Sequence, residues 1–330
     1  MTELTDWLRG RPWDPPAAPE TVLGVPTMIS PQELTLLYRL AAERYDGRGV
    51  IVDAGCFLGG STAALAEGIE ANRGDLPRRP VHTYDRFVLE DVSKNAYPQL
   101  VADIAVGEST LPRFRQVLGD RLDRVEVHDG DIRRERWGGD PISILFIDVA
   151  KSWEINDHVN REFFPCLVPG ESVVIQQDYV HEWCPWLHIT MELLGDAFEF
   201  AGSLPYATAV FVPTRAISRD EIPANLREEL DDETKLELFD RAARRFAGED
   251  LGIIQLARAA LLADMGDPAA GVALVDRTLA EHGGHERVAI VSAAMRDQLA
   301  AQPRTTARRG PRRPTFPRRW PFRGPRRGRS

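Results

Sequence analysis

The sequence predicts an α/β fold: a doubly wound, mostly parallel sheet with a terminal antiparallel hairpin, followed by an α-helical C-terminal extension. Three observations lead to it: short apolar runs spaced for helices, a strand–turn–helix stretch near residue 50, and a change to helical periods after Pro213. The gaps between runs are long enough for crossover helices, as in a parallel sheet with helices on both faces. The runs are Val50–Val52, Val81–Tyr84, Val125–His128, Ile142–Ile147 and Ser172–Ile175.

Two further strand candidates lie close together at the end of this alternation. Phe198–Gly202 and Ala207–Val212 are joined by a few residues that include Pro205, so we expect an antiparallel hairpin at one edge of the sheet. The run Ile142–Ile147 is nearly all apolar, which indicates a central strand buried on both faces.

The segments before the first strand differ in character. Residues 1–26 are rich in proline and are expected to be irregular. Ser30-Pro31-Gln32-Glu33 has the pattern of a capping box with proline at the first helical position, so a helix is expected to begin there. We therefore place the main domain at residues 27–215.

The remaining chain divides into a helical extension at 216–302 and an Arg/Pro-rich tail at 303–330. Within the extension, Leu256–His282 has the pattern of a helix pair broken at Gly266-Asp267, and it is expected to pack on the main domain or on a second subunit in a homo-oligomer. The tail is expected to be disordered because it has too few apolar residues for a core. It is either a solvated segment or a binding segment for an acidic partner, RNA or an anionic membrane surface.

Charge and composition narrow the classes of function. The net charge is −9, but residues 301–330 hold 11 arginines and no acid, which leaves the first 300 residues with 30 basic and 50 acidic side chains. This acidic body argues against nucleic acid as a partner. No stretch approaches the roughly 18 apolar residues that cross a membrane, and the N-terminus has no secretory pattern. With only three cysteines, we expect a reduced, cytoplasmic protein.

The stretch Val50–Ala64 is the clearest candidate for a ligand site. A strand runs into Asp53, and the small residues Gly55, Gly59, Gly60 and Ser61 then lead into an Ala-rich helix. Such a turn lets backbone N–H groups approach an anionic or polar ligand. It lacks the dinucleotide fingerprint because Phe57 takes the place of the second glycine.

Acids follow the next two strand candidates. Asp85 ends the second strand, where an acid can accept hydrogen bonds from ribose hydroxyls. Asp131 follows the third strand, where an acid can accept from an adenine amino group. Ligands of open α/β sheets bind at these carboxyl ends.

Together, Ile51–Ser61, Tyr84–Phe87, Gly130-Asp131 and the terminal hairpin resemble a class I methyltransferase that depends on S-adenosylmethionine (SAM). The chain is most similar to the small-molecule and sugar O-methyltransferase branch, which includes macrocin-type enzymes. The resemblance implies a seven-stranded sheet whose last strand is antiparallel. It also implies roles in SAM binding: the methionine end at Gly55, Gly59 and Ser61, the ribose at Asp85 and the adenine at Asp131. We count Asp53 among the cofactor-binding residues as well.

The fourth and fifth strand ends carry candidates for the chemistry. Asp148-x-x-Lys151 and Gln177-Asp178 resemble the layout of catechol-type O-methyltransferases, which use an Asp, a Lys as base and an acid–amide pair. Asp148, Gln177 and Asp178 would then bind Mg²⁺. Macrocin-type enzymes carry acids at the positions of Ala150 and Gln177, so a cation would be held more weakly here. Metal dependence stays open at this point.

Histidines and aromatic residues follow the fifth strand. His181 and His188 rival Lys151 as the general base, although a lone histidine is more often structural. Tyr179, Trp183 and Trp186 either stack on a flat or sugar-like acceptor or cap the core.

These expectations lead to a SAM-dependent O-methyltransferase for a small hydroxylated acceptor, a sugar or a secondary metabolite. Asp148 would be catalytic together with Lys151 or His181. Two rivals remain: a methyltransferase-like fold that no longer catalyses and serves as an interaction module, and an RNA methyltransferase guided by the basic tail. The altered acids at the fourth and fifth strands favour the first rival, and the acidic body opposes the second.

Overall fold

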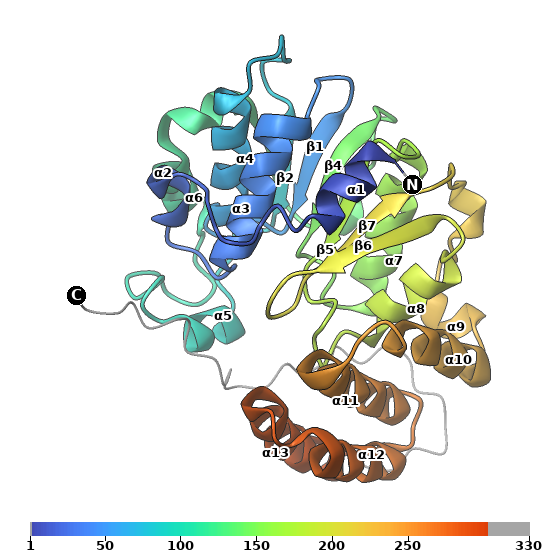
Figure 1. Ribbon diagram of the computed structural model, residues 1–330. Helices are drawn as coiled ribbons and strands as arrows, with labels where there is room; N and C mark the ends of the chain where they lie inside the picture. Colours follow the sequence, from blue (N-terminus) through green and yellow to red (C-terminus); the bar gives the residue numbers. More distant parts are fainter. Residues whose placement is uncertain (1, 303–330) are drawn as a thin grey trace. The chain divides into compact units, whose positions relative to one another are not determined.

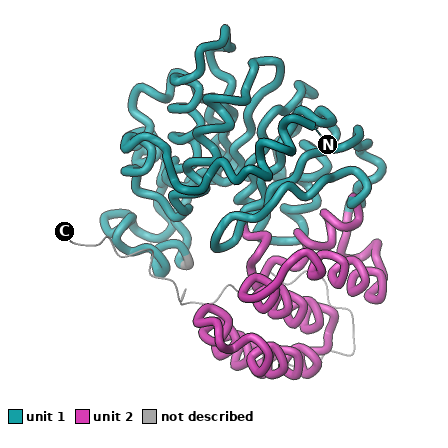
Figure 2. Tube along the Cα trace, in the orientation of Figure 1, with its two compact units in different colours: residues 1–177, 195–224 teal, residues 178–194, 225–330 magenta. Residues whose placement is uncertain are grey.

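The computed structural model describes residues 2–302, and the predicted tail at 303–330 lies outside the described residues. Within the described residues, the chain forms two compact units (Figure 2): unit 1 comprises residues 2–177 and 195–224, and unit 2 comprises residues 178–194 and 225–302. The expected division kept 178–194 with the main domain. The structure groups it with the extension because α8 (Pro185–Leu193) packs against α10 (Asp232–Ala243).

Unit 1 is built on a seven-stranded sheet with the order β3-β2-β1-β4-β5-β7-β6 (Figure 1). Only β7 runs antiparallel to its neighbours, and β6 and β7 form the edge hairpin. The predicted fold class is confirmed. The strands are β1 (Val50–Ala54), β2 (Val81–Asp85), β3 (Val125–Asp129), β4 (Ile142–Ile147), β5 (Val173–Gln176), β6 (Phe198–Ser203) and β7 (Ala209–Pro213).

The middle of the sheet is its most buried part. β1 pairs with β2 on one side and with β4 on the other, with Ile51 opposite Val81 and Ile144. β4 lies between β1 and β5 and is almost wholly buried, as its apolar sequence predicts. The crossovers from β1 to β2 and from β4 to β5 proceed in opposite directions, so right-handed connections place their helices on opposite faces.

The helices of unit 1 begin and end where local signals place them. Ser30 and Glu33 form the predicted capping box: the Ser30 N–H donates to Glu33 Oε2 (2.6 Å), and the Glu33 N–H donates to Ser30 Oγ (3.2 Å). The helices are α1 (Glu3–Arg9), α2 (Glu20–Leu23), α3 (Pro31–Arg39), α4 (Gly60–Ala71), α5 (Asp91–Ala96), α6 (Leu111–Leu118) and α7 (Trp153–Phe163). Shorter helical turns are η1 (Leu40–Arg44), η2 (Gly119–Arg124), η3 (Ile132–Arg134), η4 (Phe164–Cys166) and η5 (Arg219–Glu221).

Two parts of unit 1 differ from the expectation. The N-terminal segment contains α1 and α2 rather than only irregular chain, because Thr2 caps α1 and Leu8 is buried. Between β3 and β4 the described chain has η3 but no α-helix, consistent with glycines and a proline near residues 138–141. The Trp137 ring covers this region, edge-on to His82 (5.3 Å) and to Phe163 (5.6 Å).

Unit 2 is helical, as predicted for the extension. Besides α8 and α10 it contains α9 (Leu226–Glu229), α11 (Gly248–Asp264), α12 (Pro268–His282) and α13 (Glu286–Ala300). Asp267 caps α12 by accepting the Ala270 N–H (3.0 Å), as its sequence indicates. None of the helices in residues 2–302 combines the length and apolarity needed to cross a membrane.

Candidate functional site

The candidate site lies where the strand order of the sheet reverses. β1 connects to β2 on one side and β4 connects to β5 on the other, so the carboxyl ends of β1 and β4 flank a topological switch point. Gly55, just after β1, has φ +101°, and a Cβ there would lie 2.7 Å from the Asp148 carbonyl carbon. A glycine is therefore needed for the two strand ends to approach this closely.

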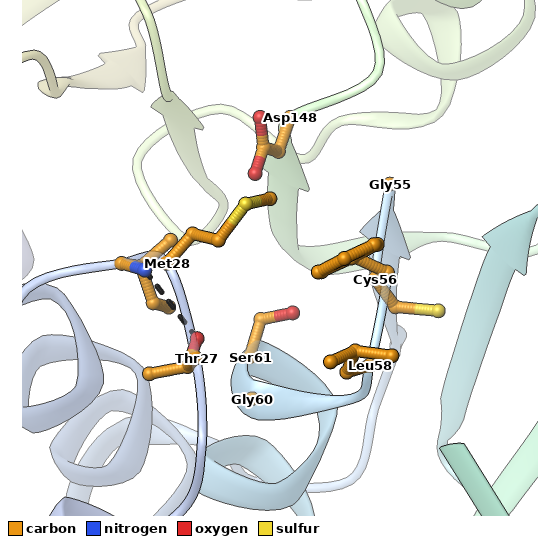
Figure 3. Close-up of a pocket in the computed structure, with 10 residues that line it drawn as sticks. Thr27, Met28, Gly55, Cys56, Leu58, Gly60, Ser61 and Asp148 are labelled. Atoms are coloured by element: carbon orange, nitrogen blue, oxygen red, sulfur yellow. Dashed lines mark hydrogen bonds between the residues drawn. The ribbon is translucent and has the colours of Figure 1, made fainter. Parts of the chain in front are cut away.

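A small pocket with a cavity volume of about 10 Å³ lies at this point (Figure 3). It is lined by three adjoining stretches of chain: Thr27–Ile29, Gly55–Leu58 with Gly60-Ser61, and Asp148. The Ile29 N–H donates to Thr27 Oγ1 (3.3 Å), and the Met28 side chain extends toward Asp148 (Figure 3). Sequence reasoning missed residues 27–29 because they form an irregular stretch without a motif.

The N-terminus of α4 forms one wall of the pocket. Gly59 is its N-cap with φ +91°, and no side chain caps the helix. The first turn of α4 also carries no acidic residue. The positive end of the helix can therefore receive an anionic group of a ligand.

Asp53 lies beneath this turn and is fully buried. Its Oδ2 accepts hydrogen bonds from Ser61 Oγ (3.0 Å) and Thr62 Oγ1 (2.5 Å). Its Oδ1 is buried and has no hydrogen-bond partner among the described residues. Burial raises the pKa of Asp53 to about 6, against the lowering by these hydrogen bonds. Asp53 and Ser61, two predicted cofactor residues, therefore hold each other in place.

Asp85 fixes the middle of the turn. Its Oδ2 accepts the Phe57 N–H (2.8 Å), and its Oδ1 accepts the Phe87 N–H (2.7 Å). Burial raises its pKa above the usual range, although both hydrogen bonds lower it. Phe57 has φ +48°, a conformation uncommon for a residue with a side chain. Each oxygen of Asp85 keeps a second lone pair, so the carboxylate can still accept from a ribose.

Asp131, the predicted adenine residue, follows β3 and is held by Arg133. Its Oδ1 accepts Arg133 Nε–H (3.0 Å) and the Arg133 N–H (3.1 Å). The hydrogen bond from the Arg133 side chain is the main reason that the pKa of Asp131 falls to about 2. Its carboxylate is therefore an ionised acceptor across the physiological pH range.

Three predicted catalytic or metal residues gather at the ends of β4 and β5. Lys151 Nζ donates to Asp148 Oδ1 (2.5 Å) in a half-buried ion pair. The Gln177 N–H donates to the Ile147 carbonyl (3.0 Å), which ties the two strand ends together. Gln177 Oε1 is buried without a hydrogen-bond partner among residues 2–302. The Asp148–Lys151 ion pair and the Gln177 amide therefore lie at the ends of two neighbouring strands, β4 and β5.

The predicted residues after Gln177 belong to unit 2. Asp178 is buried with φ +63°. His181 is buried, and its Nδ1 accepts the Trp183 N–H (3.1 Å), so the neutral ring carries its proton on Nε2. His188 lies among aromatic rings, and burial lowers its pKa to about 3, which makes it a neutral core residue.

The predicted cation site consists of Asp148, Gln177 and Asp178. In the part of the chain that the structure describes, no group of three or more His, Cys, Asp or Glu side chains is placed to hold a metal ion. The predicted set has two carboxylates and the Gln177 amide, which together bind Mg²⁺ more weakly than three carboxylates do. We assign no step to a cation.

Comparison with known proteins gives similarity at the level of solved structures. No protein-family model matches the chain, and no curated protein sequence is significantly similar to it. The O-methyltransferase NovP is similar with a TM-score of 0.45 and 19% identity, covering 64% of this chain and 98% of that chain. CalS11, a TDP-rhamnose 3'-O-methyltransferase of calicheamicin biosynthesis, has a TM-score of 0.42 and 18% identity, covering 64% and 93%. An O-methyltransferase from Bacillus cereus in complex with SAH has a TM-score of 0.38 and 19% identity, covering 65% and 98%.

Proposed function

We propose that this chain is a SAM-dependent O-methyltransferase that acts on a small hydroxylated acceptor, a sugar or a secondary metabolite. The observation that carries the proposal is the pocket at the switch point, which joins the uncapped start of α4 to Asp148. SAM has an anionic carboxylate, an ammonium group and a ribose diol. The start of α4 suits the carboxylate, the unpartnered Oδ1 of Asp53 suits an N–H donor, and Asp85 suits the diol.

Bound SAM supplies an activated methyl group on a positively charged sulfur. Asp148 accepts a hydrogen bond from the acceptor hydroxyl and orients its oxygen. Lys151, as the neutral amine, takes the hydroxyl proton while the new carbon–oxygen bond forms and the carbon–sulfur bond breaks. The resulting ammonium is the form that pairs with Asp148 in the structure.

Lys151 suits this role better than His181. Because His181 Nδ1 already accepts the Trp183 N–H, its neutral ring presents an N–H to any further partner and has no free lone pair. Lys151 Nζ is bonded to Asp148 and its side chain is 36% exposed, so it can exchange its proton with water between turnovers. We therefore assign the base to Lys151.

Asp148→Asn tests this assignment. The amide keeps the size of the side chain but loses the charge that orients the hydroxyl and pairs with Lys151. We expect methyl transfer to fall by about 10²-fold or more, while the affinity for SAM changes by less than about threefold, because Asp53, Asp85 and α4 are untouched. The measurements are calorimetry with SAM and turnover on a panel of sugar nucleotides, phenols and catechols.

Glu154→Gln is the matched control, since Glu154 is an exposed acid at the start of α7 and the change in charge is the same. It should leave both quantities unchanged. Equal loss of SAM affinity and turnover in Asp148→Asn would show a structural role instead. SAM binding without turnover by the unmodified protein on the whole panel would favour the non-catalytic interaction module.

A further inference from the structure

A second cavity, with a volume of about 240 Å³, lies wholly within unit 1 and is called here the strand-start cavity. Residues at the amino ends of β4 and β5 line it, together with residues of α1 and η1. Ser143 lies in this lining at the start of β4, whereas Asp148 directly follows the end of that strand. At about 3.3 Å per residue the two positions are about 16 Å apart. The strand-start cavity is therefore separate from the switch-point pocket.

Apolar side chains form part of the lining. Leu40 of η1, Ile144 of β4 and Val173 of β5 are buried residues that border the cavity. An apolar cavity of about 150 Å³ is already large enough to bind benzene. The strand-start cavity therefore has room for an aromatic ring or a short alkyl chain, and burial of that group against these side chains would favour binding.

Arg44 is the least exposed charged side chain at the strand-start cavity. It is 27% exposed, whereas the other charged side chains of the lining are at least 47% exposed. These others are Glu3, Asp46, Arg48 and Glu171. Burial raises the pKa of Tyr45 to about 12, so this phenol in the lining adds no negative charge. The charge that water solvates least is therefore positive.

Arg44 has donors left for a ligand. Among the described residues its guanidinium makes one hydrogen bond, from Nη1 to Glu3 Oε1 (2.7 Å), and it lies 5.0 Å from the centre of the Trp7 ring. A guanidinium has five N–H groups, so the others remain for a further acceptor. The Glu3 side chain is 87% exposed, and an ion pair with such an exposed acid contributes little stability. A carboxylate that enters the cavity can therefore replace Glu3 on Arg44.

We propose that the strand-start cavity binds a small carboxylate that carries an apolar group. Arg44 binds the carboxylate, because the fork of a guanidinium matches the two oxygens of this group. The apolar group lies against Leu40, Ile144 and Val173. A neutral ligand of the same shape would lose the charged hydrogen bonds, and a cation would be repelled. This site does not depend on the proposed methyl transfer.

NMR of the full chain with labelled Leu, Ile and Val methyl groups tests the proposal. The probes are phenylacetate, which is aromatic, and hexanoate, which is aliphatic. Phenylacetamide is the neutral control of the same shape as phenylacetate. The methyl signals of Leu40, Ile144 and Val173 report binding in the strand-start cavity, and those of Leu58 report binding in the switch-point pocket.

We expect phenylacetate to shift the three reporter signals with a Kd of about 1 mM, which is within reach of a ligand of about ten non-hydrogen atoms. Phenylacetamide should bind at least about tenfold more weakly, because it lacks the charge.

Two variants should change the affinity for phenylacetate in opposite directions. Arg44→Met keeps much of the stem but removes the donors, so it should weaken binding by about tenfold. Glu3→Gln removes the competing acid, so it should tighten binding by about two- to fivefold. Arg39→Met is the matched control: Arg39 also lies over the Trp7 ring (5.6 Å) and is 32% exposed, but it does not line the cavity. It should leave the affinity unchanged.

Absence of any shift at Leu40, Ile144 and Val173 with both carboxylates at about 10 mM would overturn the proposal. So would shifts at Leu58 alone, equal affinity for phenylacetamide, or unchanged affinity in Arg44→Met. If Arg44→Met does not fold, its methyl spectrum shows this, and Glu3→Gln decides instead. Binding by Glu3→Gln that is no tighter than by the unmodified protein would then contradict the role of Arg44.

Discussion

Asp53 is a buried acid with two unlike oxygens. One accepts from Ser61 and Thr62, and the other lacks a hydrogen-bond partner within the described chain. In the unfolded chain, water solvates both oxygens of the carboxylate. In the folded protein the carboxylate is buried, and Oδ1 has no hydrogen-bond partner among the described residues. Burial therefore raises its pKa to about 6, from about 3.9 in an unfolded chain.

This shift predicts a particular pH dependence of stability. Between about pH 4 and pH 6 the folded state binds the Asp53 proton more tightly than the unfolded state, so stability falls as the pH rises and stays lower above pH 6. Asp53→Asn removes this titration. As the pH rises across that window, the unfolding free energy of the unmodified protein should fall relative to that of the variant by up to about 3 kcal/mol.

Urea denaturation of both proteins at several pH values from 4 to 7.5 measures the difference, and titration of the other acids cancels in the comparison. A difference that is constant with pH would show that Asp53 ionises normally in the folded protein.

Some residues of the site could be predicted from the sequence, and others could not. Asp85 and the Asp148–Lys151 pair were predicted from their places after strands, and the structure puts them at those strand ends. Their roles stay predictions. Thr27 and Met28 were not foreseen, because they line the pocket through tertiary packing on α4, which leaves no local pattern.

At the scale of elements, the junction between α4 and the segment before α3 depends on one missing side chain. A Cβ on Gly60 would lie 2.2 Å from Thr27 Oγ1 and 2.5 Å from Thr27 Cβ. Thr27–Ile29 can therefore close over the start of α4 only because residue 60 is glycine.

Gly60→Ala should destabilise the protein by about 1–3 kcal/mol, since the clash outweighs the better helix propensity of alanine. It should also weaken SAM binding, because the pocket wall at residues 27–29 must move. Urea denaturation and calorimetry measure the two effects. Gly138→Ala, where nothing lies within 4 Å of the added carbon, should change stability by less than about 0.5 kcal/mol.

Adding Thr27→Gly to Gly60→Ala should recover part of the lost stability. If Gly60→Ala is as stable as the Gly138→Ala control, the close packing of Thr27 on α4 is not needed for the fold.

Elements with strong local signals were predicted well. The capping box at Ser30, the cap at Asp267 and the apolar run of β4 each depend on neighbouring residues, and each is confirmed. The conformation of the connection from β3 to β4 was not predicted. Its length alone permits a helix, but the chain at Trp137, Gly138 and Gly139 is irregular, and the Trp137 ring packs edge-on against His82.

For the whole molecule, the sequence predicts the doubly wound sheet and the helical extension but not how the chain divides into units. Residues 178–194 continue directly from β5, so pattern alone joins them to the sheet. They belong to unit 2 because α8 packs on α10 and the Val180 carbonyl accepts a hydrogen bond from Arg287 Nη2. Such contacts between distant residues carry no periodicity that could reveal them.

The central claim is that the switch-point pocket binds SAM, and calorimetry tests it most directly. The ligand is S-adenosylhomocysteine, the demethylated product, titrated into the unmodified protein, Asp85→Asn and the control Asp129→Asn, whose exposed acid ends the next strand. We predict one bound ligand per chain, binding at least about tenfold weaker in Asp85→Asn because a charged acceptor is lost, and no change in Asp129→Asn. Absence of binding by the unmodified protein at about 1 mM ligand, a binding free energy weaker than about −4 kcal/mol, would contradict the account.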